Sequence, residues 1–179
     1  MRLLIIGGSV FLGWHLVEAA LARGDAVTLF NRGRSASPRS SKVEQRQGDR
    51  KGDLAALAAG EWDAVVDCCG YLPRDVARMA ECLHGRVGRY VFISSISVYA
   101  GFKWPNDEDS ALGRIEDSDT ETVDGRTYGP LKALCRGCGH GALRRIGFAA
   151  DPPRPHRRPA RPDPALHLLA GARGPGGRW

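Results

Sequence analysis

The start of the chain joins a short apolar run to a glycine turn, and this junction constrains the fold more than any other feature. The run RLLIIGG indicates a buried strand that ends in glycine, and FLGWHLVEAALARG continues with apolar residues at helical spacing, with Gly24 as its expected C-cap. Glycine at such a turn lets the backbone approach a phosphate, and the helix N-terminus adds amide donors. The alternative is a plain tight turn between strand and helix.

Strands and helices continue to alternate along the chain to about residue 99. The further predicted strands are DAVTLFNR, WDAVVDCCG and RYVFISSISVY, and the further predicted helices are DLAALAAG and PRDVARMAECLHG, with Pro73 in the first turn and Gly85 at the end of the latter. Strands rich in Val, Ile and Leu that alternate with helices predict a doubly wound parallel sheet of the α/β Rossmann class. Residues 101–127 are polar and are expected to form a loop.

The positive charge of the chain is confined to its C-terminal part. The whole chain has a net charge of +6, but residues 1–135 carry 17 Lys and Arg against 18 Asp and Glu, whereas residues 136–179 carry nine Arg and two Asp. Seven of the eleven prolines also lie in this last segment, and Arg, Pro, Gly and Ala make up 31 of its 44 residues. We predict one folded domain over 1–135 and a disordered tail over 136–179.

The N-terminal run and the cysteines indicate the compartment. MRLLII is too short for a signal peptide or a membrane span. Five cysteines, an odd number with two of them adjacent, suit buried thiols in a reducing compartment better than a disulfide framework. We predict a cytoplasmic protein that does not enter a membrane.

Three segments, GGSVFLG, ISSISVY and YGPLK, follow one another in an order that resembles the extended and atypical short-chain dehydrogenase/reductase superfamily, of the NAD-dependent epimerase/dehydratase type. The resemblance covers residues 1 to about 135. It implies hydride transfer between a nicotinamide cofactor and a carbonyl or secondary alcohol of a small molecule, nucleotide sugars among them. Many members have a middle glycine in the first motif where this chain has Val10.

The resemblance and the end of the second predicted strand suggest how a dinucleotide would bind. An acidic residue at that strand end would favour NAD, whereas Arg favours the 2′-phosphate of NADP, so Arg32, with Arg34 nearby, predicts NADP first and NAD second. A solvated arginine on a loop is the alternative. By resemblance Asp49 would lie near the adenine and Cys69 to Tyr71 near the nicotinamide, although these could equally be loop and core residues. The expected cofactor-binding residues are Gly7, Gly8, Phe11, Leu12, Gly13, Asn31, Arg32, Asp49, Cys69 and Lys132.

Tyr128 and Lys132 have the Tyr-x-x-x-Lys spacing that puts both side chains on one helix face. A nearby ammonium favours the phenolate, so the tyrosine can exchange a proton with a substrate oxygen while hydride moves. The resemblance adds Ser95 as the hydroxyl that orients the substrate, and gives Lys132 a second role on the nicotinamide ribose. A Tyr and a Lys four residues apart also occur by chance, but three motifs in order favour the catalytic reading.

We predict no metal site. His15 and His84 have no ligand partners at metal spacing, and the Cys-x-x-Cys of Cys135 and Cys138 has no second pair, so we interpret it as accidental.

The C-terminal segment can be read in another frame. Codon degeneracy allows residues 151–169, DPPRPHRRPARPDPALHLL, to be read one base forward as IRPGLIVGPHDPTRRFTYW. This string resembles the strand and the RPG and glycine-proline turn through which the superfamily continues into its substrate-binding part. We therefore expect a one-base shift near Cys135, so that the chain is a fragment that lacks the substrate-binding part and is inactive as written.

A second hypothesis is a non-catalytic dinucleotide- or RNA-binding member of the same superfamily. The complete set of Ser95, Tyr128 and Lys132 argues against it, because a protein that only binds has no chemical need for all three. The basic tail could attract RNA phosphates, but an out-of-frame tail has no selected function, so nucleic acid is not an expected partner.

Overall fold

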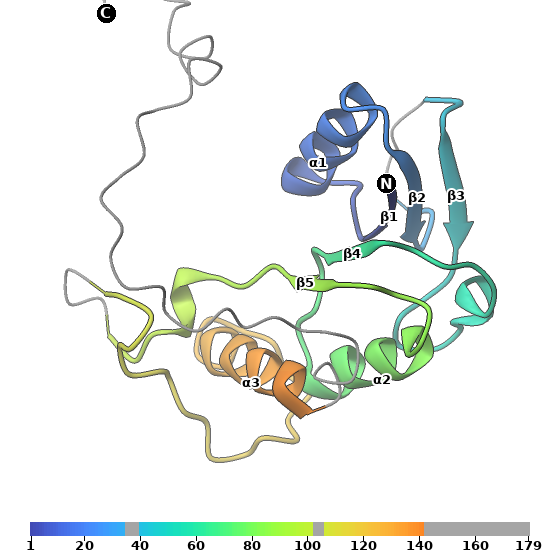
Figure 1. Cartoon of the computed structure of the whole chain (residues 1–179). Coiled ribbons are helices and arrows are strands. Elements are labelled where there is room, and N and C mark those ends of the chain that lie inside the picture. The colour runs from blue at the N-terminus through green and yellow to red at the C-terminus, as the bar shows by residue number, and fades with distance from the viewer. Residues whose placement is uncertain (35–39, 102–105, 142–179) are drawn as a thin grey trace, which may run out of the picture. The chain divides into compact units, whose positions relative to one another are not determined.

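A computed structural model describes residues 1–34, 40–101 and 106–141, and in it five parallel strands form one sheet (Figure 1). The strands are β1 (Arg2–Ile6), β2 (Ala26–Asn31), β3 (Val43–Gln47), β4 (Ala64–Asp67) and β5 (Tyr90–Phe92). Their order in the sheet is β3-β2-β1-β4-β5, so the chain winds outward from β1 in one direction and then returns to continue in the other. The sheet confirms the predicted doubly wound α/β fold.

Helices cover both faces of the sheet. They are α1 (Phe11–Ala22), α2 (Pro73–Leu83) and α3 (Tyr128–Gly141), with short 3-10 turns at η1 (Ala55–Leu57) and η2 (Ile96–Val98). Alternate residues of β1 divide between two apolar clusters: Leu3 and Ile5 pack with Val17 of α1, whereas Leu4 and Ile6 pack with Met79 of α2. In Figure 1, α1 lies on one side of the sheet and α2 and α3 lie together on the other.

Glycine and proline end and start these helices as the sequence predicts. Gly24 follows α1 with φ +83°, Gly85 follows α2 with φ +75°, and Pro73 is the first residue of α2, where its missing amide costs no helical hydrogen bond. The boundaries of α1 and α2 therefore follow from local sequence.

The edge strand β3 was not predicted. Its sequence, VEQRQ, has a single buried apolar residue, Val43, which pairs with Val27 of β2. An edge strand with one face in solvent needs few apolar residues, so the apolar pattern that marks the central strands is missing.

Two other predicted elements are shorter than expected. The strand predicted over 89–99 ends at Phe92, because the Ser95 side chain accepts a hydrogen bond from the Ser97 amide (3.1 Å) and starts η2. DLAALAAG forms only the turn η1, since the segment is too short for a stable α-helix and Gly60 follows with φ +109°.

The predicted polar loop is largely irregular where it is described. An antiparallel bridge joins Tyr99 to Leu112, and the Gly113 amide donates to the Val98 carbonyl at 2.7 Å. Helix α3 then continues past the predicted domain boundary at residue 135 to Gly141, and the segment read in another frame, 151–169, lies outside the described residues. Within the described ranges, no helix is long and apolar enough to cross a membrane.

Candidate functional site

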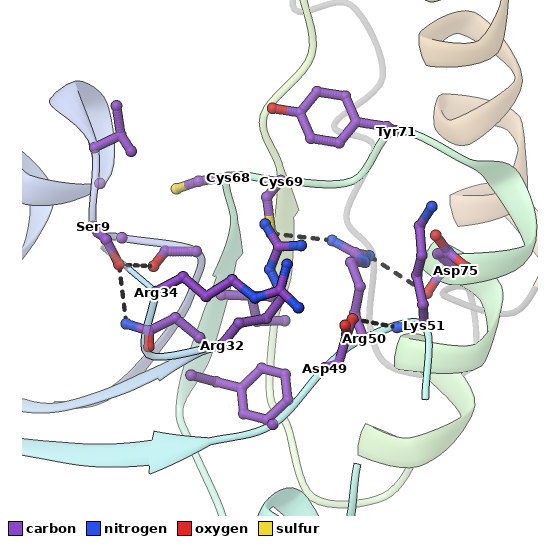
Figure 2. Close-up of a pocket in the computed structure, with 18 of the residues that line it drawn as sticks. Ser9, Arg32, Arg34, Asp49, Arg50, Lys51, Cys68, Cys69, Tyr71 and Asp75 are labelled. Carbon is purple, nitrogen blue, oxygen red and sulfur yellow. Dashed lines mark hydrogen bonds between the residues drawn. The ribbon is translucent and has the colours of Figure 1, made fainter. Parts of the chain in front are cut away.

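A cavity of about 650 Å³ opens at the carboxyl ends of β1, β2 and β4. It lies beside the point where the connections from neighbouring strands diverge, which is where open α/β sheets bind ligands. Figure 2 shows side chains from all three strand ends converging on it. The predicted cofactor-binding residues that line the cavity are Gly7, Gly8, Phe11, Leu12, Gly13, Asn31, Arg32, Asp49 and Cys69.

The glycine turn between β1 and α1 is built for close backbone packing. Gly7 and Gly8 have φ angles of +99° and +61°, in the region that favours glycine. A β-carbon on Gly13 would lie 2.2 Å from the Gly8 α-carbon, so only glycine lets α1 approach the turn this closely. Val10, at the departure from the common motif, has φ −129° and is 72% exposed, so its backbone does not require glycine.

The start of α1 leaves room for a phosphate. The N-cap Val10 makes no side-chain capping bond, and the first turn contains no acidic residue. The first amides of a helix lack partners within the helix, and the helix dipole favours an anion there. The glycine turn and the N-terminus of α1 together fit the pyrophosphate of a dinucleotide.

The end of β2 presents cations to the same cavity. Asn31 is tied locally: its Nδ2 donates to Ser9 Oγ at 3.0 Å, and its Oδ1 accepts from the Gly33 amide at 2.8 Å. The side chains of Arg32 and Arg34 extend from this strand end into the cavity (Figure 2). Among the described residues neither guanidinium forms an ion pair, which leaves both available to an anionic ligand.

Asp49 lies on the loop after β3, on the far side of the cavity from the glycine turn (Figure 2). Its Oδ1 accepts from the Lys51 amide at 3.0 Å, and its own amide donates to the Asp53 carbonyl at 3.1 Å. These bonds fix the loop, and among the described residues no hydrogen bond occupies the second carboxylate oxygen, which leaves it available to a ligand.

The sequence did not reveal a buried ion pair between Arg50, which lines the cavity, and Asp67, which does not. Arg50 Nη1 and Nη2 donate to the two Asp67 carboxylate oxygens at 2.8 and 2.9 Å, and Tyr90 Oη donates to Asp67 Oδ2 at 2.6 Å. Although burial acts to lower the pKa of Arg50, the hydrogen bonds and charge of Asp67 raise it above its ordinary value. Burial, with the charge of Asp67, raises the pKa of Tyr90 well above its ordinary value.

The loop after β4 brings two thiols and an aromatic ring to the cavity. Burial raises the pKa of Cys68 to about 11 and also raises that of Cys69, so both are thiols near neutral pH. Tyr71, which is 45% exposed, lines the cavity, and its ring centre lies 6.2 Å from that of Tyr128. Burial raises the pKa of Tyr71 as well.

The predicted catalytic residues Ser95, Tyr128 and Lys132 do not line this cavity, although Tyr128 and Lys132 lie close to the Tyr71 ring. Lys132 is buried, and its Nζ donates to the carbonyl oxygens of Gly70 (3.0 Å) and Ile93 (2.6 Å). Burial lowers the pKa of Lys132. The Ser95 hydroxyl donates to Ser97 Oγ at 3.2 Å, and in the described part of the chain no hydrogen bond joins Ser95, Tyr128 and Lys132 to one another.

The described residues contain no cluster of His, Cys, Asp or Glu that could hold a metal ion. His15 lies near Glu18 and stacks edge-on against Phe11 on α1. Cys135 is buried, and its burial raises its pKa to about 12; all five cysteines are free thiols.

Comparison with solved structures identifies the fold. UDP-galactose 4-epimerase matches with a TM-score of 0.66 and 22% identity over 82% of this chain and 53% of that one. A short-chain dehydrogenase/reductase superfamily protein from Agrobacterium tumefaciens with bound NAD matches with a TM-score of 0.59 and 21% identity, over 77% and 44%. The chain has the short-chain dehydrogenase/reductase fold. Bordetella bronchiseptica WbmG in complex with NAD shares this fold at a TM-score of 0.61 and 18% identity, over 77% and 48%.

Sequence comparison finds a curated relative that matches part of the chain. The chain is 32% identical over 114 residues to the chloroplast stem-loop binding protein of 41 kDa b of Arabidopsis thaliana, covering 55% of this chain and 30% of that protein. No family model matches the chain. The chain thus spans about half the length of the solved short-chain dehydrogenase/reductase structures and a third or less of this relative.

Proposed function

We propose that residues 1–135 are the cofactor-binding half of an NAD(P)-dependent oxidoreductase of the epimerase, dehydratase or reductase kind. The observation that carries this proposal is the contact of Gly13 with Gly8, where a β-carbon would lie 2.2 Å from the neighbouring backbone beside a cavity large enough for a dinucleotide. Several solved neighbours are named as complexes with NAD, and others as epimerases of UDP-sugars, which supports a nucleotide sugar as the substrate class.

Within this function we propose NADP(H) as the preferred cofactor. Arg32 and Arg34 line the cavity at the end of β2, where no acidic side chain is present to bind a ribose 2′-hydroxyl. The NAD named in the solved neighbours makes NAD(H) the competing choice. Parallel titrations of NADPH and NADH decide between them: we expect NADPH to bind about tenfold more tightly, and equal or tighter NADH binding would overturn the preference.

We propose catalytic roles for three residues. Bound nicotinamide would supply the hydride chemistry; Tyr128 Oη would exchange a proton with the substrate oxygen, Ser95 Oγ would hydrogen-bond that oxygen, and the Lys132 ammonium would hold the ribose. Within the described ranges Lys132 uses two of its three donors on carbonyls, so one donor is left for a ligand. Ser95 would exchange its contact with Ser97 for the substrate.

We propose that the chain as written binds cofactor weakly and does not turn over. The support is the shifted reading of 151–169, which restores a segment resembling the missing substrate-binding part. Resequencing the gene from the codon of Tyr128 onward tests the frame. NADPH oxidation by the 179-residue chain that is lost on Tyr128→Phe would overturn the proposed inactivity.

A second candidate function is RNA binding, because the curated relative is named a stem-loop binding protein. The near-neutral charge of residues 1–135 argues against it, since RNA affinity comes largely from Lys and Arg contacts with phosphates. A filter-binding titration with a stem-loop RNA at rising salt tests it. Binding that persists near physiological salt after removal of residues 136–179 would favour this candidate.

We also propose a cytoplasmic location, on the ground that all five cysteines are free thiols and suit a reducing compartment. Cell fractionation tests this, and recovery in another compartment, such as the plastid named for the curated relative, would contradict it.

A further inference from the structure

The loops after β3 and β4, which both line the candidate cofactor cavity, are joined by an ion pair between Arg50 and Asp67. The loop after β3 carries Asp49, Arg50 and Lys51, and the loop after β4 carries Cys68 and Cys69; all five line the cavity. Asp67, the last residue of β4, does not line the cavity but holds both loops from below.

Asp67 binds each loop directly. On one side it accepts the two bonds from the Arg50 guanidinium, and on the other its Oδ1 accepts from the Cys69 amide at 3.1 Å. The guanidinium lies between the two loops, with Nη1 at 3.4 Å from Cys69 Sγ and Nη2 at 3.4 Å from the Asp75 carbonyl (Figure 2). Asp67 and Arg50 therefore link the two loops, and of this pair only Arg50 lines the cavity.

The arrangement is costly for a purely structural element. Asp67 is fully buried and Arg50 nearly so, and burying two charges is offset only when their geometry is close to ideal. Arg50 Nε is buried and has no hydrogen-bond partner among the described residues, which adds to the cost. Apolar side chains of similar volume would pack here without the cost of burying charge. The two parallel hydrogen bonds from a guanidinium, in contrast, fix both the distance and the orientation of the carboxylate.

We propose that Arg50 and Asp67 are positioning residues for the dinucleotide, which set the distance between the adenine-side loop at Asp49 and the nicotinamide-side loop at Cys69. The inference rests on the proposed function, because it takes the cavity to be a dinucleotide site. It assigns a role to a buried pair in which Arg50 lines the cavity and Asp67 does not.

The test compares a ligand that spans both loops with one that reaches a single loop. NADPH spans both, whereas adenosine 2′,5′-bisphosphate reaches only the adenine side. In the full 179-residue chain, we expect Arg50→Lys to weaken NADPH binding about tenfold or more and the bisphosphate by less than about threefold, as measured by calorimetry. A merely structural role would lower the folded fraction and so weaken both ligands by the same factor.

Arg46→Lys is the matched control. Arg46 lies on β3 and binds Glu44 and the Ala56 carbonyl, yet it does not line the cavity, so its replacement should lower thermal stability without changing the ratio of the two affinities. Should Arg50→Lys fail to fold, Tyr90→Phe removes one donor from Asp67, keeps both charges, and is expected to show a smaller loss in the same direction.

The outcomes separate the two proposals. Equal losses for the two ligands in Arg50→Lys or Tyr90→Phe, or no loss for either, would overturn the positioning role while the proposed function stands. A wild-type chain that binds neither ligand would overturn the proposed function and this inference with it.

Discussion

A β-carbon on Gly129 would lie 2.0 Å from the carbonyl oxygen of Ser97, so α3 and the segment that follows β5 touch backbone to backbone. Tyr128 precedes this contact, and Ser95 lies two residues before Ser97. Gly129→Ala should therefore push α3 away from Ser95 and Ile93. We expect a loss of about 1–3 kcal/mol in the free energy of unfolding, measured by urea denaturation.

Gly137→Ala is the control for that experiment. Gly137 lies in the same helix, and a β-carbon there would meet nothing within 4 Å. Replacing an exposed helical glycine by alanine should stabilise the chain by about 0.5–1 kcal/mol. If the two substitutions had the same effect, the contact between α3 and Ser97 would not be what fixes the helix.

The glycine turn makes a second prediction. Gly13→Ala places a methyl group against the Gly8 backbone, which should open the turn, abolish detectable NADPH binding and lower the midpoint of thermal unfolding. Gly52→Ala, at a loop position with open space around the β-carbon, should change neither property. Calorimetry and circular dichroism provide the two readouts, and intact NADPH binding by a folded Gly13→Ala chain would contradict the prediction.

The central part of the fold is predictable from sequence because apolar runs and glycines at helix ends determine it locally. β1 has four buried residues in its five-residue span, and α1 and α2 end at glycines with positive φ. The sequence does not predict β3, because the strand has a single buried residue, Val43, and so lacks an apolar pattern. β5 was predicted too long because the apolar run continues through Ile93, whereas a serine side chain ends the strand geometry.

The candidate site is likewise predictable from sequence only in part. The glycine turn and Arg32 lie at the ends of predicted parallel strands, which bring their carboxyl ends to one edge, so their convergence could be predicted. Asp49 follows β3, which the sequence does not predict, and only the resemblance placed it near the adenine. The Arg50 and Asp67 pair could not, because the two residues lie 17 positions apart and their pairing depends on the register of β3 and β4 across the sheet. The residues around Arg50 in the sequence do not indicate that its side chain is buried.

Cofactor preference provides a third prediction. Replacing both Arg32 and Arg34 by alanine removes the cations at the end of β2, so NADPH affinity should fall about tenfold or more while NADH affinity changes little. Arg89→Ala, an exposed residue outside the cavity, should leave both affinities unchanged. An equal fall in affinity for NADPH and NADH would mean that these arginines do not bind the 2′-phosphate.

Acid should loosen the start of α3. The Asp124 carboxylate accepts hydrogen bonds from the amides of Thr127 (3.0 Å) and Arg126 (2.8 Å), and these bonds lower its pKa. A carboxyl group whose folded-state pKa is lowered contributes stability above its unfolded pKa and loses it as pH falls through the folded value. Thermal unfolding midpoints measured from about pH 6 down to about pH 3 should fall less steeply in Asp124→Asn than in the wild type.

Titration of the 179-residue chain with NADPH, followed by nicotinamide fluorescence, tests the central claim most directly. The cavity at the glycine turn predicts saturable binding with a Kd between about 10 µM and 1 mM, displaced by adenosine 2′,5′-bisphosphate and lost in Gly13→Ala. A fluorescence signal that rises linearly to about 5 mM, or saturable binding that a folded Gly13→Ala chain retains, would contradict it.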